Sequence, residues 1–458
     1  MVLGKIFERF AKGSPLTVML RGTLEYALRP ELLDQLFVGT ATRQYTHKLL
    51  FSTLVDVTAL VVCRIHRSHN AAYQADPGRI GVSLRALYDK LDHTEPAVSA
   101  AMVHHIGERL LPVLQQLHAG LPSRLPGYRV RILDGNHLAA TQHRLKELRP
   151  LRSGPLPGQA LVVYDPQWML ITGVVPCEDG HAQERALLGE ILPLVQPKDV
   201  WVGDRNFCTT DFLLGIASRD SFFVIRQHAQ TLRWELKGKR WYCGRSETGQ
   251  VYEQAVQLTD EHGNILAARR VTVELDKPTR DGDTAIHLLT NIPEKGADAL
   301  VIAAAYHGRW TIETAFGELA ATLSAEIDTL AYPKAALFCF CVGLAAYNVL
   351  SVTKGALRQG HGQKKVMEEV SGYYIANEIA RTYGGMMIAI PDEEWRVFAR
   401  LTVQKFARLL KELAQGVRLE TLKKHPRGPK KPVLKRPKNN NEPHVSTARL
   451  LEKRKRTG

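Results

Sequence analysis

The first quarter of the chain repeats apolar residues at the spacing of amphipathic helices. Apolar side chains recur every three or four positions in PELLDQLF, THKLLFSTLVDVTALVVCRI and MVHHIGERLLPVLQQL. We therefore expect residues 1–120 to be helical. Within them, VSLRALYDKLDHTEPAVSAAMV has a helix–break–helix rhythm. That rhythm fits a helix-turn-helix DNA reader, and it fits two ordinary packed helices equally well.

The pattern changes to short apolar runs after Gly127. YRVRILDG, QALVVYDP and WMLITGVVP predict three strands, the last two joined as a hairpin. HAQERALLGEILPLV then predicts an amphipathic helix, and DVWVGDRNF predicts a fourth strand. Three strands, a helix and a fourth strand are the opening order of an RNase H-like fold. We expect the first part of such a core over residues 127–220.

Strand-like runs continue over residues 221–292 and then give way to helices. The runs are SFFVIRQ, TLRWELKG, RWYCG, VYEQAVQL, RRVTVEL and AIHLLTNI. They predict a β-rich insertion, after which residues 293–420 complete the core and add C-terminal helices. The sequence therefore predicts an α/β protein with an RNase H-like catalytic core, a β-rich insertion, and helical regions at the N-terminal and C-terminal sides.

One apolar segment is long enough to cross a bilayer. No charged residue lies between Lys334 and Lys354, and residues 335–352 read AALFCFCVGLAAYNVLSV. The segment also contains Asn348 and several small residues, and it is flanked by charged sequence. We expect a buried helix of a large core and no membrane partner.

Composition and charge point to a globular protein with a polyanionic partner. The chain has 458 residues, of which 45% are hydrophobic and 23% charged, and this excludes wholesale disorder. Six cysteines without a C-x-x-C pair indicate reduced thiols in a cytoplasmic protein rather than a zinc site or a disulfide framework. The net charge of +15 suits a nucleic acid.

Most of that charge lies in the last 38 residues. Residues 421–458 contain eight lysines and five arginines against two glutamates, so they carry +11 and the remainder only +4. The segment is proline-rich and lacks apolar periodicity, which predicts a disordered or loosely extended basic tail. Such a tail suits contact with DNA phosphates, although a solubilising tail would read the same way. The candidate contacts are Arg427, Lys430, Lys431, Lys435 and Arg436.

Three acidic residues stand at special places in the predicted core. Asp134 ends the first strand, Asp204 ends the fourth, and Glu313 lies in the helix after the insertion. Neighbouring strand ends converge at one edge of a sheet, and a helix beside them can add a third carboxylate. Three hard oxygen ligands suit one or two Mg²⁺ ions, which can promote in-line attack on a phosphodiester. Each acid taken alone would more simply be a cap or a surface charge.

The segment YHGRWTIETAFGELA places a polar stripe beside an apolar one. Tyr306, Arg309 and Glu313 fall at i, i+3 and i+7 of a predicted helix, where the first two could position phosphates. The simpler alternative is an ion pair between Arg309 and Glu313. Arg205 and Asn206, which follow Asp204, could contact DNA or shape the turn.

Other polar residues near these acids are left out of the site. We expect Asp179 to cap the helix that begins near His181. Asp211 lies in the helix after Asp204, and His307 has no assigned role.

These residues resemble a known family signature. The run Tyr306-x-x-Arg309-Trp310-x-Ile312-Glu313 is similar to the Y-x2-R-x3-E signature of DDE transposases of the insertion-sequence four family, and ILDGNH and VGDRNF match its companion motifs. The resemblance runs from about residue 80 into the tail. It implies catalysis by Asp134, Asp204 and Glu313 with Mg²⁺ or Mn²⁺. It also implies a bacterial, cytoplasmic, DNA-associated protein that moves its own element by cut and paste, as a homodimer on double-stranded DNA comprising terminal inverted repeats and target.

The match departs from the signature at two places. The family has a lysine seven residues after the glutamate, where this chain has Ala320, and an expected tryptophan is replaced by Ile286-His287. Members that cut through a DNA hairpin are expected to use both residues around a flipped base. The tryptophans that could substitute are Trp234, Trp241 and Trp310. Two alternatives therefore stay open, namely a catalytically impaired DNA-binding derivative and an RNase H-like nuclease without strand transfer.

Overall fold

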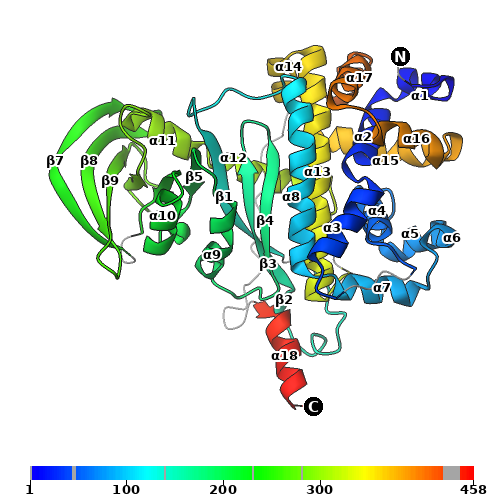
Figure 1. Ribbon diagram of the computed structural model, residues 1–458, viewed down its shortest axis with the longest axis horizontal. Helices are drawn as coiled ribbons and strands as arrows, with labels where there is room; N and C mark the ends of the chain where they lie inside the picture. Colours follow the sequence, from blue (N-terminus) through cyan, green and yellow to red (C-terminus); the bar gives the residue numbers. More distant parts are fainter. Residues whose placement is uncertain are drawn as a thin grey trace.

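A large sheet and a set of long helices lie side by side in this protein (Figure 1). The computed structural model describes residues 3–43, 48–138, 141–228, 232–279, 282–327, 329–425 and 444–457. Within these residues, nine strands form one mixed sheet, with helices packed beside it. The expectation of a mixed α/β protein is confirmed.

Helices from the two ends of the chain are interleaved. The N-terminal helices are η1 (Lys5–Phe7), α1 (Glu8–Gly13), α2 (Pro15–Ala27), α3 (Pro30–Thr40), α4 (Phe51–Val62), α5 (His69–Ala75), α6 (Pro77–Ile80), α7 (Leu84–His93) and α8 (Pro96–Gln116). The C-terminal ones are α13 (Pro333–His361), α14 (Gln363–Glu369), α15 (Gly372–Ala389), α16 (Asp392–Ala399), α17 (Val403–Gln415) and η5 (Leu419–Leu422). α2 packs against α13, α15, α16 and α17. Gly22 permits the approach to α16, because a β-carbon there would overlap the Phe398 ring.

The helix–break–helix segment is part of this core. α7 and α8 follow the predicted rhythm, but α8 packs between α13 and strand β4 (Leu170–Cys177). One side of α8 is fully buried, including Met102, Ile106 and Leu110. A recognition helix must present a free face to a DNA groove. A helix-turn-helix reader also packs one side of its helices on a core, and α8 keeps exposed residues such as His104 and Glu108, so both interpretations fit and the DNA reader stays a prediction.

The long apolar segment forms the central helix of the molecule. α13 is the one helix in the described residues with the length and hydropathy to cross a membrane, and its most apolar window is entirely buried within the protein. The polar residue in that window, Asn348, is hydrogen-bonded at both ends of its amide. Its Oδ1 accepts from Ile171 N (2.7 Å), and its Nδ2 donates to Ile171 O (2.8 Å). Both polar groups of this side chain are therefore satisfied by strand β4.

Five strands form one half of the sheet, in the order β4-β3-β1-β5-β6, with β4 at the edge. β1, β3 and β4 pair antiparallel, whereas β1, β5 and β6 pair parallel. The segment between β4 and β5, predicted as one amphipathic helix, is instead three short helical pieces. Pro193 lies in the last of them and cannot donate a backbone hydrogen bond, which favours a broken helix. The elements are β1 (Arg129–Leu138), β3 (Gly158–Asp165), η2 (Glu184–Leu187), α9 (Leu188–Ile191), η3 (Leu192–Leu194), β5 (Asp199–Gly203), η4 (Arg205–Phe207), α10 (Thr210–Ala217) and β6 (Phe222–Arg226).

The inserted strands extend the same sheet rather than forming a separate one. β7 (Arg233–Arg245), β8 (Gly249–Thr259), β9 (Ile265–Leu275) and β10 (Ala285–Thr290) are antiparallel, and β10 pairs with β6. Two sequence expectations change here. β6, which was grouped with the insertion, pairs parallel with β5 and belongs to the half of the sheet that contains β1, β3, β4 and β5. The runs TLRWELKG and RWYCG form the single strand β7, whose pairing shifts register between Lys237 and Trp241.

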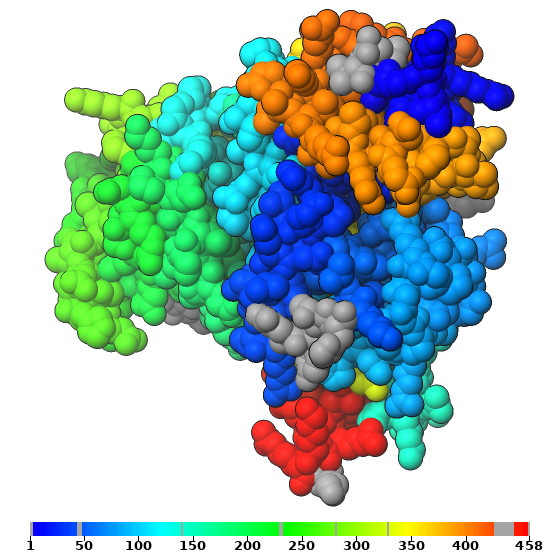
Figure 2. Space-filling model, turned by 45° about the vertical axis from the view of Figure 1, so that its right-hand side comes forward, coloured from blue at the N-terminus to red at the C-terminus, as the bar shows by residue number. Residues whose placement is uncertain are grey.

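The end of the basic tail folds back onto the core, contrary to the expectation of disorder there. β11 (His444–Ser446) pairs parallel with β2 (Gly154–Leu156), and α18 (Thr447–Thr457) follows and projects from the body (Figure 2, red). Asp179 holds this segment, accepting from Ser446 Oγ (2.7 Å) and Arg449 Nε (2.8 Å). Its Oδ1 also accepts from His181 N (3.0 Å), in a turn and not at a helix start.

Candidate active site

The first candidate acid lies within a strand, not at its end. β1 continues four residues past Asp134 to Leu138, so the predicted position is wrong in this detail. However, the parallel pairing of β1 with β5 stops at Ile132↔Val202, and beyond it β1 pairs with β3. Asp134 therefore lies just past the point where β1 and β5 separate. Its Oδ1 accepts a hydrogen bond from Gly135 N (3.1 Å).

The second acid follows the neighbouring strand directly. Asp204 comes one residue after β5 and caps η4, accepting from Arg205 N (2.5 Å). Because β1 and β5 are adjacent and parallel, Asp134 and Asp204 emerge at the same edge of the sheet. The side chains of Arg205 and Asn206 are exposed beside them.

The Tyr–Arg–Glu segment spans two helices instead of the single helix predicted. α11 (Ala299–His307) and α12 (Trp310–Thr322) meet at Gly308 and Arg309. Tightened three-residue hydrogen bonds, such as Arg309 N to Tyr306 O (2.9 Å), bridge the junction. The predicted apolar stripe of α12 is buried at Ile312 and Leu319 and at Leu323, the residue that ends the helix, all at most 3% exposed, whereas its fourth member, Phe316, is half-buried. This packing fixes the helix that carries Glu313.

Arg309 joins two of the three acids. Its Nη1 lies 3.2 Å from Asp134 Oδ2, and its Nη2 lies 3.3 Å from Glu313 Oε1. The Arg309 side chain is 9% exposed, so it faces the carboxylates rather than open solvent. The ion pair weighed as the simpler alternative is thus present, and Asp134 shares it.

Burial and neighbouring charges shift the pKa values at this edge. Burial raises the pKa of Asp134 to about 6; Arg309 opposes the shift, and the charges of Glu184 and Glu313 add to it. Burial, followed by the charge of Asp204, raises the pKa of Tyr306 to about 12. The pKa of Arg309 is raised because the acids around it outweigh the opposing effect of burial. Asp204 is therefore electrostatically coupled to Tyr306 and Arg309.

A fourth acid at this edge was not found from the sequence. Glu184 begins η2, and its Oε2 accepts from Asn206 Nδ2 (3.2 Å). A β-carbon on Gly135 would overlap Glu184 Oε1. No motif spacing marks this residue. The topology does: β4 runs back to the edge where β1 and β5 separate, so the residues that follow β4 lie there.

The carboxylates are the right ligand type for a divalent cation, but they are held by Arg309. Within the residues that the structure describes, no three His, Cys, Asp or Glu side chains are grouped closely enough to hold a metal ion. Carboxylate oxygens are the donors that Mg²⁺ and Mn²⁺ prefer. The guanidinium between Asp134 and Glu313 shows that this position accepts positive charge.

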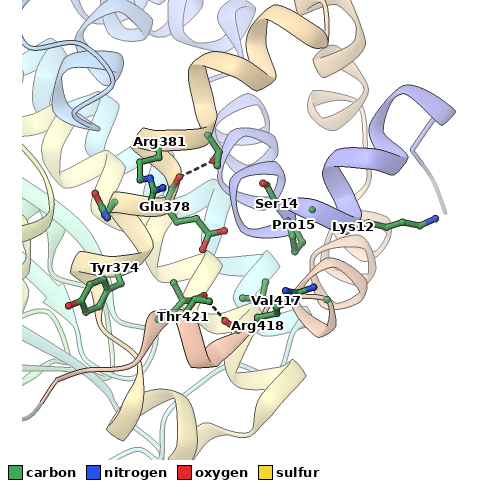
Figure 3. A pocket seen from close by; sticks show the side chains of 14 residues that line it. Lys12, Ser14, Pro15, Tyr374, Glu378, Arg381, Val417, Arg418 and Thr421 are labelled. Atoms are coloured by element: carbon green, nitrogen blue, oxygen red, sulfur yellow. Dashed lines mark hydrogen bonds between the residues drawn. The ribbon is translucent and has the colours of Figure 1, made fainter.

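A cavity opens beside the helix junction, toward the inserted strands. Its volume is about 780 Å³, and Tyr306, Trp310 and Ile286 are among the residues that line it. Trp310 is 58% exposed. A different cavity of about 660 Å³ lies between α15 and the start of α2, lined by Ser14, Glu378 and Arg381 among others (Figure 3). None of the candidate acids lines that second cavity.

The remaining predicted contacts are not described by the structure. Five basic residues of the tail lie outside the described residues: Arg427, Lys430, Lys431, Lys435 and Arg436. The described chain on either side of them is anchored, by η5 before and by β11 after.

Comparison with known proteins identifies the domain that contains this edge. Residues 125–349, just under half of the chain, match the family model described as transposase DDE domain. Among solved structures, the chain is similar to the piggyBac transposase of a synaptic complex with hairpin DNA, at 11% identity and a TM-score of 0.37, over 88% of this chain and 85% of that one. That score is too low to bear on the fold or the activity. No curated protein matches the chain. Asp134, Asp204 and Glu313 all lie within the residues that match a transposase DDE domain.

Proposed function

We propose that this protein is an insertion-sequence transposase that cuts and joins DNA at the edge carrying Asp134, Asp204 and Glu313. One observation carries the proposal. Asp134 on strand β1 and Glu313 on helix α12 both contact the guanidinium of Arg309, and Asp204, in the turn after β5, lies close enough for its charge to raise the pKa of Arg309. The strand order β4-β3-β1-β5-β6, with its antiparallel and parallel pairings, supports an RNase H-like core. The signature around Tyr306 supports membership of the insertion-sequence four family.

The three acids would hold the divalent ions, Mg²⁺ or Mn²⁺ and two in number. Bound there, the ions would supply an activated oxygen nucleophile and stabilise the leaving oxygen. The chain's own groups would position the DNA. Arg309 and Tyr306 would orient the phosphate next to the acids, and Arg205 and Asn206 would contact the flanking backbone from the turn after β5.

Replacing Arg309 by Gln tests whether its positive charge occupies the position where a divalent metal ion would bind between Asp134 and Glu313. Two carboxylates would lose their shared partner, so we expect the free energy of unfolding in urea to fall by about 1–3 kcal/mol without metal. Added Mg²⁺ should restore more stability to this variant than to the wild type. Arg205→Gln, an exposed change beside Asp204, is the matched control. Equal unfolding of R309Q and wild type, with no gain from Mg²⁺, would contradict the assignment.

The cavity beside α11 and α12 is suited to a displaced base. Trp310 offers an exposed aromatic face at its lining, and stacking on such a face offsets the cost of unstacking a base. Trp241 is also exposed, on β7, whereas Ile286 occupies the lining where the family would have a tryptophan. Trp310 is therefore the candidate platform in this chain.

The alternative function, a catalytically impaired DNA-binding derivative, is suggested by alanine at position 320, where the family has lysine. Ala320 brings no positive charge to its turn of α12, but Arg64 Nη2 donates to Ala320 O (3.3 Å) and to Leu323 O (3.4 Å). A cation is therefore present at this turn, from another part of the chain. This observation favours the active enzyme over the derivative.

The partners follow from the reaction. Double-stranded DNA would be bound at the element's terminal inverted repeats and at the target, by a homodimer assembled across the two ends. The N-terminal helical region and the basic tail would add contacts away from the acids. The protein would be cytoplasmic and associated with bacterial DNA.

The direct test is a cleavage assay on duplex DNA carrying the inverted repeat that brackets the coding region. With Mg²⁺ or Mn²⁺ we expect a nick at the repeat end and then a joined product, both lost with a chelator. Binding without any metal-dependent nick would favour the impaired derivative. Nicking without a joined product would favour a nuclease.

A further inference from the structure

One face of the inserted strands carries aromatic and basic side chains. β7, β8 and β9 form the end of the sheet that lies farthest from α13 (Figure 1). One residue from each of four paired strands contributes to a row on this face: Tyr242, Tyr252, Thr272 and His287. Arg270 lies two residues before Thr272 and therefore on the same face. The cavity beside α11 is lined by Val273 and Ile286, so it lies on the opposite face of these strands.

Arg270 is fixed in place, but its charge has no acidic partner. Its Nε donates to Gln227 Oε1 (2.8 Å), and its guanidinium carbon lies 5.2 Å from the centre of the Trp234 ring. Among the described residues, no carboxylate pairs with Arg270, and its Nη atoms donate no hydrogen bond. Glu274 on this face pairs with Arg240 instead (2.6 Å). The outer side of the Arg270 guanidinium is therefore available to an anion.

The charge around Arg270 is mainly positive. Burial, followed by the charge of Arg240, lowers the pKa of Arg270. Burial, and then the charges of neighbouring arginines led by Arg270, lowers the pKa of His287 to about 4. A bound anion would relieve this repulsion.

Tyr242 adds an exposed ring to the same face. It is 58% exposed. Its ring makes a T-shaped contact with Tyr252, with 5.5 Å between the ring centres, and the guanidinium carbon of Arg240 lies 3.7 Å from the centre of the Tyr252 ring. Proteins bind single-stranded nucleic acid by combining such rings, on which bases stack, with cations that contact the backbone.

This face also reaches the edge of the sheet where the acids emerge. β5 and β6 are parallel neighbours, so the end of β6 lies beside the turn that carries Asp204. Gln227 directly follows β6, and its backbone N–H donates to His287 O (2.8 Å). A DNA strand opened beside Asp204 can therefore continue onto the inserted strands at His287.

We propose that this face binds a single strand of DNA that is unpaired beside the cleavage edge, with a base stacked on Tyr242 and a phosphate held by Arg270. The inference rests on the proposed function, which supplies the opened DNA. Bases in a duplex are already stacked on one another, so the Tyr242 ring favours an unpaired strand. The site is separate from the cavity that contains Trp310, because that cavity lies on the other face of the strands.

The test measures binding of the full chain to a labelled oligothymidine and to a labelled duplex, by fluorescence anisotropy in a chelator over a range of salt concentrations. Tyr242→Leu should weaken oligothymidine binding about 5-fold or more without changing the salt slope, because stacking is lost and no charge is removed. It should weaken duplex binding less. Arg270→Gln should weaken oligothymidine binding and reduce the salt slope by about 0.7, the effect of one phosphate contact on a single strand. Arg270→Lys should keep the wild-type slope.

The matched controls have similar side chains in other places. Tyr373→Leu removes a tyrosine that is 52% exposed and has a T-shaped contact with its neighbour Tyr374. Arg219→Gln removes an exposed arginine that precedes β6, at the opposite edge of the sheet. Both controls should bind oligothymidine like wild type.

Two kinds of failure are distinguishable. Wild-type oligothymidine binding by Y242L and R270Q, or an equal loss on duplex and single strand in Y242L, would overturn the single-strand site and leave the proposed cleavage function standing. A wild type that nicks duplex DNA without binding oligothymidine would do the same. A wild type that binds neither DNA and makes no metal-dependent nick would overturn both.

Discussion

Asp134→Asn and Glu313→Gln are each expected to abolish metal-dependent nicking, by about 10³-fold or more, while leaving duplex binding in place. Each change keeps the side chain's size and removes one negative charge from the edge where β1, β5 and α12 meet. A neutral amide is a poor ligand for Mg²⁺ and cannot replace the carboxylate. Initial rates of nicking on the inverted-repeat duplex, with Mg²⁺ and with Mn²⁺, give the measurement.

The matched control is Asp211→Asn, an exposed acid in the first turn of α10. It lies seven residues after Asp204 and should nick at the wild-type rate. Because Asp134 and Glu313 share Arg309, the double variant should lose no more activity than either single one. Nicking by D134N or E313Q within a few-fold of wild type would show that the cleavage site lies elsewhere.

The central part of this site could be predicted because its residues follow local patterns. Apolar runs marked the strands that carry Asp134 and precede Asp204. The three-to-four spacing of apolar residues at positions 312, 316, 319 and 323 marked the side of α12 that packs on the core. Adjacency of parallel strands then brings the acids together without further information. The position of Asp134 inside β1 was missed, because strand length there depends on pairing with β3, and local sequence does not specify that pairing.

The features of the structure that the sequence did not predict depend on contacts between distant segments of the chain. Glu184 reaches the acids because β4 returns to their edge. The tail was predicted to be free throughout because its composition is polar, yet β11 pairs with β2 some 290 residues earlier, and Asp179 accepts from Ser446 and Arg449. The single helix expected from Tyr306 to Glu313 is two helices, and Arg309, at their junction, contacts Asp134 of the distant strand β1.

Neutralising the basic segment between the two anchors should weaken DNA binding on every duplex alike. Changing Arg427, Lys430, Lys431, Lys435 and Arg436 together to Gln removes five charges that we propose contact phosphates. Each lost phosphate contact reduces the slope of log affinity against log salt by about 0.9, so the slope should fall by about 4.5 if all five make contact. Fluorescence anisotropy with inverted-repeat and unrelated duplexes, over a range of salt concentrations, measures both effects.

Substitution is preferable to deletion because the flanking chain is structural. A truncation at residue 421 would remove Leu422, which is 1% exposed, and the β11 strand that pairs with β2. Loss of binding could then reflect unfolding instead of lost charge. Lys364→Gln and Lys365→Gln, both exposed on α14, serve as the control for removing positive charge in general. An unchanged salt slope in the five-residue variant would show that this segment does not contact phosphates. The polyanion contacts would then have to come from the mildly basic body of the protein, which carries only +4 of the net charge.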